Sequence, residues 1–401
     1  MQVKDKLWTA SFINASIGNF LLFFAFYLLV PIFPLYLMEK YESTKSMVGI
    51  VLSSYTLAAL LIRPFAGFFL DLFYRRPLYI IAYFLFILTF IGYPLAHVLG
   101  LFLFVRILHG FTFGFVTTAG NSLIIDIMPA SRRGEGLGYF GVANNLAMAI
   151  GPMTGLLMHD RFSFDSIFYT AIGVGFIGFL FANTIKAEDL SDRRNKQPLA
   201  FDRFFLFKGI NAGFSLLLMG IPYGMAVTYI AIYGKEIGLT SNVGYFFSLM
   251  AVGLVVSRLF GGKQVDKGKV VAVISWGTFL CLLGFILLST LMLFQNPLIV
   301  TLLFYIISII IGFGYGMIFP AYNALFVQLA PHNRRATASS TYMTSWDVGI
   351  GFGLIFGGVI ADKTGSLGFS FMVGSFAVAV SLVFFIRIAS KHYLKNKLEN
   401  S

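Results

Sequence analysis

Several ionisable residues lie within long apolar segments of this sequence, and the chemistry of four of them needs an explanation first. These four are Arg63, Arg106, His109 and Asp347. Moving a charge into apolar surroundings is costly unless the group is paired or hydrogen-bonded. A carboxyl group and an imidazole can bind and release protons, and guanidinium groups can hold an anion. We therefore predict that these four residues couple proton binding to another event.

Asp347 is the foremost of the four, because it lies near the predicted centre of the bilayer. It lies about 11 residues into its apolar segment, which is roughly 16 Å along a helix. A carboxyl group at that depth could exchange between a protonated form and an ion pair with a nearby cation, and this exchange would link protonation to conformation. The alternative is a static ion pair that only fixes helix packing.

Arg106 and His109 are three residues apart, so they would share one face of a helix. Histidine is the side chain that titrates closest to neutral pH, so the pair could transfer protons or contact an anion. For His109 the alternative is a neutral ring hydrogen-bonded between helices. For Arg63 the alternative is a side chain that extends toward the aqueous boundary.

Composition identifies the elements that must position these residues. Of 401 residues, 58% are hydrophobic and 11% are charged, whereas a soluble domain carries roughly 25% charged residues. The sequence is therefore that of an integral membrane protein. A single cysteine, Cys281, excludes a disulfide-stabilised secreted scaffold, and the apolar content excludes a disordered chain.

Twelve apolar segments are long enough to cross a bilayer, which takes roughly 20 residues. The sequence thus predicts an all-α integral membrane protein with twelve transmembrane helices. The predicted spans are residues 11–38, 45–70, 78–96, 100–125, 136–158, 165–185, 209–234, 241–262, 270–293, 298–327, 336–361 and 367–387.

The basic residues fall mainly on one side of this topology. With the N-terminus inside, 21 of the 29 Lys and Arg residues lie in cytoplasmic segments and five lie on the opposite side. The remaining three, Arg63, Arg106 and Arg258, lie within spans. The positive-inside rule then predicts that both termini are cytoplasmic. The same asymmetry explains the net charge of +12 without a nucleic-acid partner.

The two halves of the chain are related. A polar stretch at residues 187–208 is predicted to be a cytoplasmic linker between residues 1–186 and residues 209–401. Six residues recur at one offset of 202, and the pairs are Gly110 and Gly312, Gly114 and Gly316, Asn121 and Asn323, Pro129 and Pro331, Arg132 and Arg334, Arg133 and Arg335. Two related six-helix bundles in parallel orientation are therefore predicted.

Several motifs resemble those of the major facilitator superfamily. A Gly-x-x-x-Asp-x-x-x-Arg-Arg loop between the second and third spans has a weaker copy between the eighth and ninth. The matching positions are Gly67, Asp71, Arg75 and Arg76, and then Gly262, Asp266 and Lys269. The segment from Arg106 to Gly110 is similar to the Arg-x-x-x-Gly motif of the family's fourth helix.

The fifth span resembles a glycine-rich element associated with antiporters in that family. Its matching residues are Gly138, Gly151, Pro152 and Gly155. The sequence departs from the element at Ala147 and Leu156, which both replace glycine. This departure weakens the assignment to the antiporter branch.

The resemblance implies twelve helices in two pseudo-symmetric bundles that transport by alternating access. In this family the second and eleventh helices meet, so Arg63 would pair with Asp347. A cytoplasmic gate is also implied, in which Asp71 would face the start of the eleventh helix and Arg75 would pair with Asp126. The gating residues expected are Gly67, Asp71, Arg75, Asp126 and Asp266. Simple positive-inside anchoring is the alternative, and it is expected for Arg76.

By the same resemblance, the first, fourth, seventh and tenth spans would line a central cavity. The residues expected there are Asn19, Tyr27, Tyr223, Tyr229, Tyr315 and Tyr322, with Asn145 as the repeat counterpart of Asp347. Aromatic faces with few charges favour amphipathic or cationic apolar solutes. Packing within the core or against lipid is the alternative for these aromatic residues.

We therefore expect a secondary transporter, preferably a proton-coupled exporter of small amphipathic or drug-like compounds. The alternative is a proton-coupled uptake symporter for a small metabolite such as a sugar or an organic acid. A membrane-embedded enzyme or a sensor without transport is a third class, but no phosphate-binding loop, metal-ligand spacing or nucleophile elbow occurs. No cofactor is expected, and the partners expected are the substrate, protons and the lipid bilayer. A monomer in a bacterial cytoplasmic membrane is expected.

Overall fold

The computed structural model describes residues 6–188, 205–239, 242–331 and 335–398. Within these ranges nearly every residue belongs to a helix and none belongs to a strand. Eleven helical stretches of the described residues are long and apolar enough to cross a membrane, the first of them Ala10–Tyr41. Helix α9 adds a shorter apolar stretch, Tyr245–Arg258. The predicted all-helical membrane fold is confirmed.

The first predicted span, residues 11–38, contains two helices. They are α1 (Ala10–Leu29) and α2 (Ile32–Tyr41). Pro31 lies at the break between them. Proline has no N–H group and its ring clashes with the preceding turn, so the helix ends there and a new one begins.

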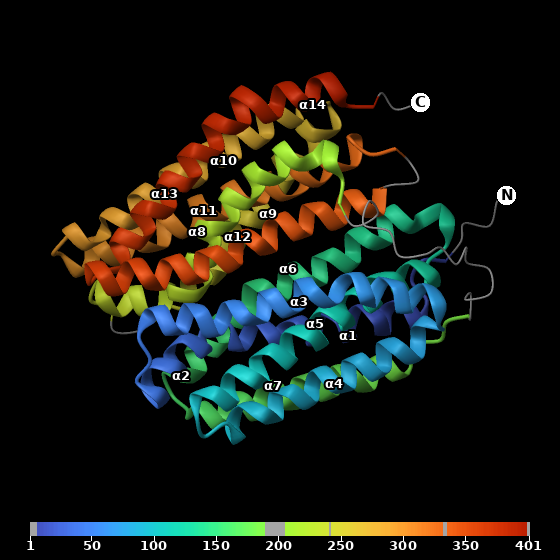
Figure 1. The fold of residues 1–401 in the computed structure, drawn as a ribbon, viewed down its shortest axis with the longest axis horizontal. Helices are drawn as coiled ribbons and strands as arrows, with labels where there is room; N and C mark the ends of the chain where they lie inside the picture. Colours follow the sequence, from blue (N-terminus) through green and yellow to red (C-terminus); the bar gives the residue numbers. More distant parts are fainter. Residues whose placement is uncertain (1–5, 189–204, 240–241, 332–334, 399–401) are drawn as a thin grey trace. The chain divides into compact units, whose positions relative to one another are not determined.

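The chain forms two compact units. Unit 1 comprises Met1–Phe33 and Leu57–Pro198. Its helices are α1, the later part of α3 (Lys45–Leu72), α4 (Arg75–Leu95), α5 (Leu99–Ile127), the 3-10 turn η1 (Ala130–Arg132), α6 (Arg133–His159) and α7 (Phe164–Asn183). In this unit α1 packs against α6 and α7, and α4 packs against α5 and α7 (Figure 1).

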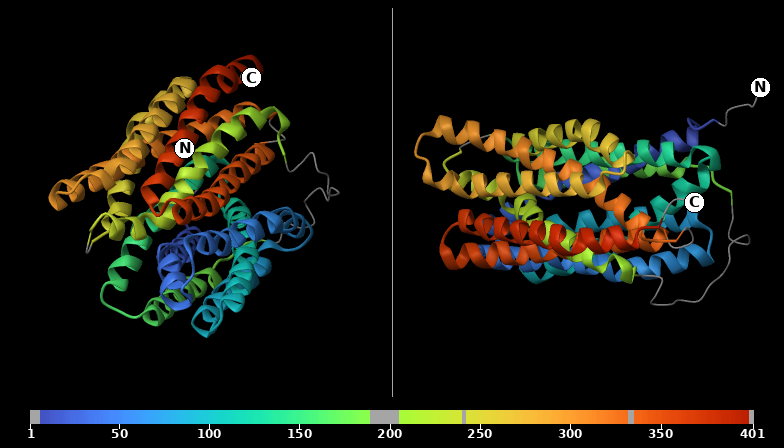
Figure 2. Two further views of the ribbon diagram at one scale, coloured as in Figure 1. Left: turned by 60° about the vertical axis from the view of Figure 1, so that its left-hand side comes forward. Right: turned by 90° about the horizontal axis from the view of Figure 1, so that it is seen from above.

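Unit 2 comprises Pro34–Thr56 and Leu199–Ser401, so it includes most of α2 and the first turns of α3. Its other helices are η4 (Phe207–Gly209), α8 (Ile210–Glu236), α9 (Tyr245–Asp266), α10 (Val270–Thr290), η5 (Leu291–Leu293), α11 (Pro297–Gln328), α12 (Arg335–Thr364), α13 (Leu367–Phe384), the π-helix η7 (Phe385–Ala389) and α14 (Ser390–Asn396). Helix α11 packs against α9 and α10, and α8 packs against α12 and α13 (Figure 2). Most of the predicted linker, residues 189–204, lies outside the described residues.

Equivalent glycines let equivalent helices approach closely in the two units. A Cβ atom at Gly151 of α6 would come close to the backbone of Leu28 in α1, and a Cβ atom at Gly353 of α12 would overlap the backbone of Ile221 in α8. Gly151 and Gly353 are 202 residues apart, the offset of the sequence repeat. The repeat therefore corresponds to a shared packing arrangement.

A glycine pair on α12 tests this close packing. A Cβ atom at Gly349 would overlap the carbonyl oxygen of Leu217, whereas a Cβ atom at Gly351 would make ordinary contacts with Thr56. We expect Gly349→Ala to lower the stability by about 1–3 kcal/mol, as overpacked sites do. Thermal unfolding of the purified protein would show a lower midpoint for Gly349→Ala than for the matched control Gly351→Ala. Equal midpoints would contradict the packing argument.

Candidate functional site

Arg106 and His109 lie side by side in the interior of unit 1, as their spacing on α5 predicts. Arg106 is 4% exposed and His109 is fully buried. The nearest guanidinium nitrogen of Arg106 lies 3.5 Å from Nδ1 of His109, and the hydroxyl of Tyr93 lies 2.6 Å from the same nitrogen. The guanidinium carbon lies 4.6 Å from the centre of the Phe33 ring, so the cation also contacts an aromatic face.

The surroundings of His109 are aromatic. The rings of Phe26, Phe86 and Phe90 lie 5.8, 5.1 and 5.0 Å from its imidazole. A buried imidazole that contacts a tyrosine hydroxyl inside such a shell has the geometry of a neutral, hydrogen-bonded histidine. His109 of α5 therefore contacts α4 through Tyr93, beside Arg106.

Asn19 of α1 contacts α6 through an amide pair. Its side-chain N–H donates to Oδ1 of Asn144. Sequence reasoning selected the adjacent Asn145 and missed Asn144, although two consecutive asparagines in an apolar span are a visible signal. Tyr27 lies two turns further along α1, where its ring packs against Phe23 and Phe26.

The predicted Arg75–Asp126 ion pair is present at the ends of α4 and α5. A guanidinium nitrogen of Arg75 lies 2.9 Å from Oδ1 of Asp126, and Arg75 also donates to the carbonyl oxygens of Leu70 and Ser122. The pair therefore ties the loop after α3 to the end of α5. Gly67 lies on α3 with open space where a Cβ atom would stand. The side chains of Asp71 and Asp266 lie outside the described residues.

Arg76 has a different role from its neighbour. It donates to the carbonyl oxygens of Ile185 and Asn183, at 2.6 and 2.8 Å, at the end of α7. A guanidinium group at the C-terminal end of a helix satisfies carbonyl groups that have no partner within the helix. This contact fixes Arg76 to the end of α7, and its positive-inside anchoring stays a prediction.

Unit 2 contains an aromatic cluster formed by α8, α11 and α12. The ring of Trp346 lies 4.9 Å from Tyr223, 5.7 Å from Tyr315 and 4.8 Å from Phe319. Tyr223 and Tyr315 are buried, whereas Phe319 and Trp346 are half-buried. Two predicted tyrosines therefore meet here. Sequence reasoning missed Phe319 and Trp346, although Trp346 is adjacent to Asp347.

Two other predicted tyrosines lie elsewhere in unit 2. The hydroxyl of Tyr322 is 2.7 Å from Oγ of Ser215, which is also 2.9 Å from Oγ of Ser381, so Tyr322 joins the buried packing of α8, α11 and α13. The hydroxyl of Tyr229 donates to the carbonyl oxygen of Leu354 at 2.7 Å and lies 3.1 Å from that of Lys45. Tyr229 thus lies where α8, α12 and the start of α3 meet.

Asp347 has charged and polar neighbours in unit 2. Its carboxylate on α12 and Arg258 on α9 both exert an electrostatic effect on the hydroxyl of Tyr342. Asp347 and Arg258 are both half-buried. Sequence reasoning noted Arg258 only as a further intramembrane cation. Arg63 lies in unit 1, so its pairing with Asp347 stays a prediction.

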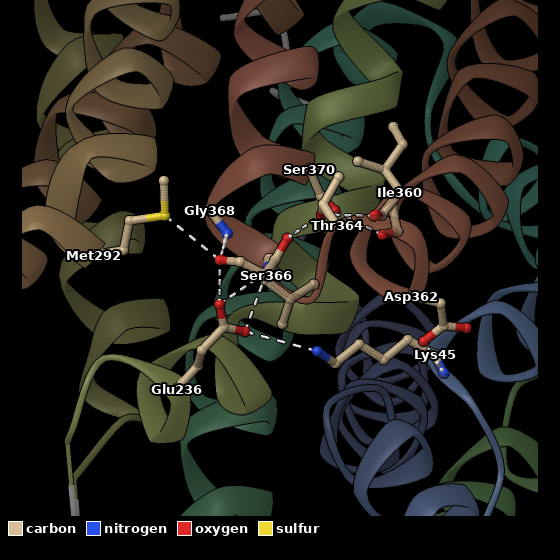
Figure 3. A network of polar contacts seen from close by, with 11 residues as sticks. Lys45, Glu236, Met292, Ile360, Asp362, Thr364, Ser366, Gly368 and Ser370 are labelled. Atoms are coloured by element: carbon tan, nitrogen blue, oxygen red, sulfur yellow. Dashed lines mark hydrogen bonds and ion pairs between the residues drawn. The ribbon is translucent and has the colours of Figure 1, made fainter.

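A polar network that sequence reasoning missed joins the start of α3 to α12 (Figure 3). The carboxylate of Asp362 accepts hydrogen bonds from the backbone N–H groups of Lys45 and Ser46, at 3.1 and 2.7 Å. A carboxylate at a helix N-terminus satisfies free N–H groups and interacts favourably with the helix dipole. Asp362 therefore caps α3 from another helix.

Glu236 caps a second helix in the same network. Its carboxylate accepts hydrogen bonds from the backbone N–H of Leu367, at 3.0 Å, and from the hydroxyl of Ser366 at the start of α13. The ammonium group of Lys45 lies 3.7 Å from the same carboxylate (Figure 3). We call Lys45, Glu236, Asp362 and Ser366 the Lys45 network. It holds the α2–α3 connection against α8, α12 and α13.

The described residues contain no group of three or more His, Cys, Asp or Glu side chains arranged to hold a metal ion. The arrangement instead provides buried charges, aromatic faces and ion pairs at helix ends. These groups can bind a solute and respond to a proton.

Comparison with known proteins identifies the family. The sequence profile of the Major Facilitator Superfamily matches residues 15–354 and 276–400. An uncharacterized MFS-type transporter of Methanocaldococcus jannaschii is 26% identical over 374 residues, which cover 90% of this chain and 93% of that protein.

Two relatives from Staphylococcus aureus are named for export or drug resistance. The staphylopine export protein is 23% identical over 86% of this chain and 88% of its own length. Quinolone resistance protein NorA is 23% identical over 95% of this chain and 97% of its own length.

Solved structures show the same fold. A peptide transporter, POT, with sulfate superimposes with a TM-score of 0.79 at 15% identity, covering 96% of both chains. The nucleoside transporter NupG superimposes with a TM-score of 0.75 at 16% identity, covering 96% of this chain and 99% of that one. The chain therefore belongs to the major facilitator superfamily, and it is a multi-pass membrane transporter and not an enzyme.

Proposed function

We propose that this transporter is a proton-coupled exporter of small amphipathic compounds, above all those with a positive charge. The observation that carries the proposal is the aromatic cluster of unit 2, in which the half-buried rings of Phe319 and Trp346 lie in contact and Trp346 precedes Asp347 on α12. Aromatic faces and a carboxylate are the groups that recognise an apolar cation. The names of two relatives, a quinolone resistance protein and an export protein, support the direction.

Asp347 would couple the substrate to the proton. In its ionised form it would attract a cationic substrate, and in its protonated form it would not, so a proton and the substrate would compete for one carboxylate. A ligand shifts a conformational equilibrium only by its differential affinity for the two states. Competition at Asp347 gives the proton and the substrate opposite preferences, which is the requirement for antiport. Arg63 would be the partner of Asp347 when the site is empty.

Unit 1 would supply a fixed charge. Arg106, which contacts Phe33 and His109, lies in the buried interior of unit 1. We propose that this cation responds electrostatically to the charge state of the transport site and that His109 positions it. Tyr27, Asn19 and Asn145 would line the part of the cavity formed by unit 1.

Gates would close the two ends of the transport path. The positive-inside rule assigns the basic end, with both termini, to the cytoplasm. One gate would lie at this end, and it would consist of the Arg75–Asp126 ion pair and the loop motifs that contain Gly67, Asp71 and Asp266. At the opposite end the Lys45 network would form the other, because it holds the α2–α3 connection on α8, α12 and α13. The protein would work as a monomer in a bacterial cytoplasmic membrane.

Opening at the Lys45 network can be measured with a buried cysteine. Leu52 of α3 is 2% exposed, and the only native cysteine, Cys281, is buried. Loss of a helix cap costs about 1 kcal/mol, so Asp362→Ala should raise the rate of maleimide labelling of Leu52→Cys about fivefold. Lys363→Ala, at the adjacent exposed position, is the matched control. An unchanged rate in Asp362→Ala would show that the network does not hold this end closed.

Uptake of a small polar metabolite, such as a sugar or an organic acid, is the second candidate. The Asn19–Asn144 amide pair favours it, because amide groups hydrogen-bond to hydroxyl and carboxylate groups. The two functions require opposite movements of the solute with respect to the proton gradient.

Cells of an efflux-deficient bacterium that express the protein provide the test. The proposal predicts that ethidium, a cationic amphipathic dye, accumulates less than in control cells, and that an uncoupler of the proton gradient removes the difference. Proton-driven accumulation of sugars or organic acids, with no effect on ethidium, would favour the uptake symporter.

A further inference from the structure

Helices α13, η7 and α14 follow one another as a continuous rod at the C-terminal end of the chain (Figure 1). The exposed side of this rod carries a shallow groove. The groove has a volume of about 420 Å³ and is lined by apolar side chains between Phe376 and Ile388 and by Arg387. Phe376 is 69% exposed and Val383 is 61% exposed, so the lining is not covered by other helices of unit 2. In a membrane protein such a surface faces the acyl chains of lipids.

Basic residues continue the line of the groove. Arg387 lines its end, and Lys391 and Lys395 follow at intervals of four residues. Residues four apart lie on one side of a helix, and all three are exposed. The sequence from Ser366 to Leu398 contains no Asp or Glu. One surface therefore changes from an apolar groove to a row of positive charges.

The rod is anchored to other helices of unit 2 near the point where the apolar groove ends and the basic row begins. The hydroxyl of Tyr393 donates to the side-chain oxygen of Gln328, and the N–H of Leu398 donates to the carbonyl oxygen of Gln328 at 2.9 Å. The ring of Phe384 packs edge-on against Phe214 of α8 at 4.9 Å. Between these anchors the chain forms the π-helix η7, a distortion that is often found at functional sites. The groove and the basic row are thus held in a preformed arrangement.

We propose that this surface binds one anionic phospholipid, with an acyl chain in the groove and the phosphate group on Arg387 and Lys391. A guanidinium group holds a phosphate through paired hydrogen bonds. Basic residues at the end of a membrane helix attract anionic head groups, whereas a phosphatidylcholine has no net charge to offer. The proposal is independent of the transported substrate.

Native mass spectrometry of the purified full-length protein tests the proposal. The protein would be titrated with phosphatidylglycerol and with phosphatidylcholine of the same acyl chains. We expect one tightly bound phosphatidylglycerol. In Arg387→Gln/Lys391→Gln its affinity should fall by at least tenfold, because each basic residue near the membrane surface contributes about fivefold. Lys40→Gln/Lys363→Gln removes the same charge from exposed positions elsewhere and should leave the affinity unchanged.

The other outcomes would overturn the proposal. Equal binding of the two lipids would show an apolar surface without head-group recognition. Equal loss in both double variants would show attraction by net charge alone. Competition by glycerophosphoglycerol as strong as that by the intact lipid would show that the groove holds no acyl chain.

Thermal unfolding of each variant would be measured alongside the lipid titrations. If Arg387→Gln folds poorly, Arg387→Lys is the second variant, because it keeps the positive charge but loses the paired hydrogen bonds of the guanidinium group. Its affinity for phosphatidylglycerol should fall below that of the wild type, and wild-type affinity in Arg387→Lys would contradict a guanidinium–phosphate contact.

Discussion

Replacing Asp347 by Asn is expected to abolish proton-driven efflux while the protein remains folded and inserted. Asn has nearly the same shape as Asp, but its amide group can neither bind a proton nor attract a substrate cation as a carboxylate does. When two ligands are coupled, binding of one typically changes the affinity for the other by about 5- to 150-fold. In Asp347→Asn, the effect of the proton on substrate affinity should disappear entirely. Transport driven by a pH gradient in proteoliposomes, normalised to the amount of folded protein, is the measurement.

Exchange without a gradient separates coupling from packing. If Asp347 only fixes helix packing, Asp347→Asn should impair exchange and gradient-driven transport equally. If Asp347 couples the proton, exchange at saturating concentrations of labelled substrate should persist in Asp347→Asn, with a weaker substrate affinity because Asn cannot attract the cation, while the response to pH disappears. Gradient-driven transport at the wild-type rate would remove Asp347 from the mechanism.

The predicted pairing of Arg63 with Asp347 has its own test. Asp347→Arg should destabilise the protein, because it replaces an anion by a further cation in the membrane-spanning region. If the two side chains are partners, the combined change Arg63→Asp/Asp347→Arg should recover most of the lost stability, as measured by thermal unfolding. Arg258→Asp/Asp347→Arg is the matched exchange on α9, and equal recovery by the two exchanges would argue against a specific pair.

The second large effect is expected at Arg106. A desolvated cation–π contact contributes about 2 kcal/mol, equivalent to about thirtyfold in an equilibrium constant. Arg106→Gln removes the contact with Phe33 and the positive charge beside His109 together. Transport by Arg106→Gln should therefore fall by more than tenfold, and Arg106→Lys should retain part of it, since lysine keeps the charge but loses the planar group.

His109 provides the control for Arg106. If it is a neutral positioning residue, His109→Gln should reduce the transport rate without shifting its pH dependence. A shift of the pH profile in His109→Gln would instead give the imidazole a direct part in proton transfer. Equal rates in wild type and Arg106→Gln would contradict the proposed role of the buried cation.

The helices could be predicted because hydropathy directly reflects the bilayer. A helix that crosses a membrane must be apolar for roughly 20 residues, so each span has a local signal. The break within residues 11–38 has a local signal too, because Pro31 cannot continue a helix. The Arg75–Asp126 ion pair could be predicted because it belongs to a recurring motif, in which the loop residue and its partner are specified together.

Contacts between distant residues were harder to predict. Asp362 and Lys45 are 317 residues apart, and Asp362 binds the backbone of Lys45, which no sequence pattern reveals. Tyr223, Tyr315 and Trp346 come from three helices, and each looks like an ordinary aromatic residue of an apolar segment. Side-chain identity shows what a residue can do, but only packing shows what it meets.

The internal pH of sealed proteoliposomes tests the central claim most directly. The purified protein would be reconstituted in vesicles with equal pH inside and outside, and ethidium would be added to the outer solution. A pH indicator trapped inside the vesicles would report the internal pH. Antiport predicts that the interior becomes more alkaline as the dye enters, whichever way each molecule is inserted, and that Asp347→Asn shows no change. Acidification of the interior, or entry of the dye through the protein without any change in pH, would contradict proton-coupled export.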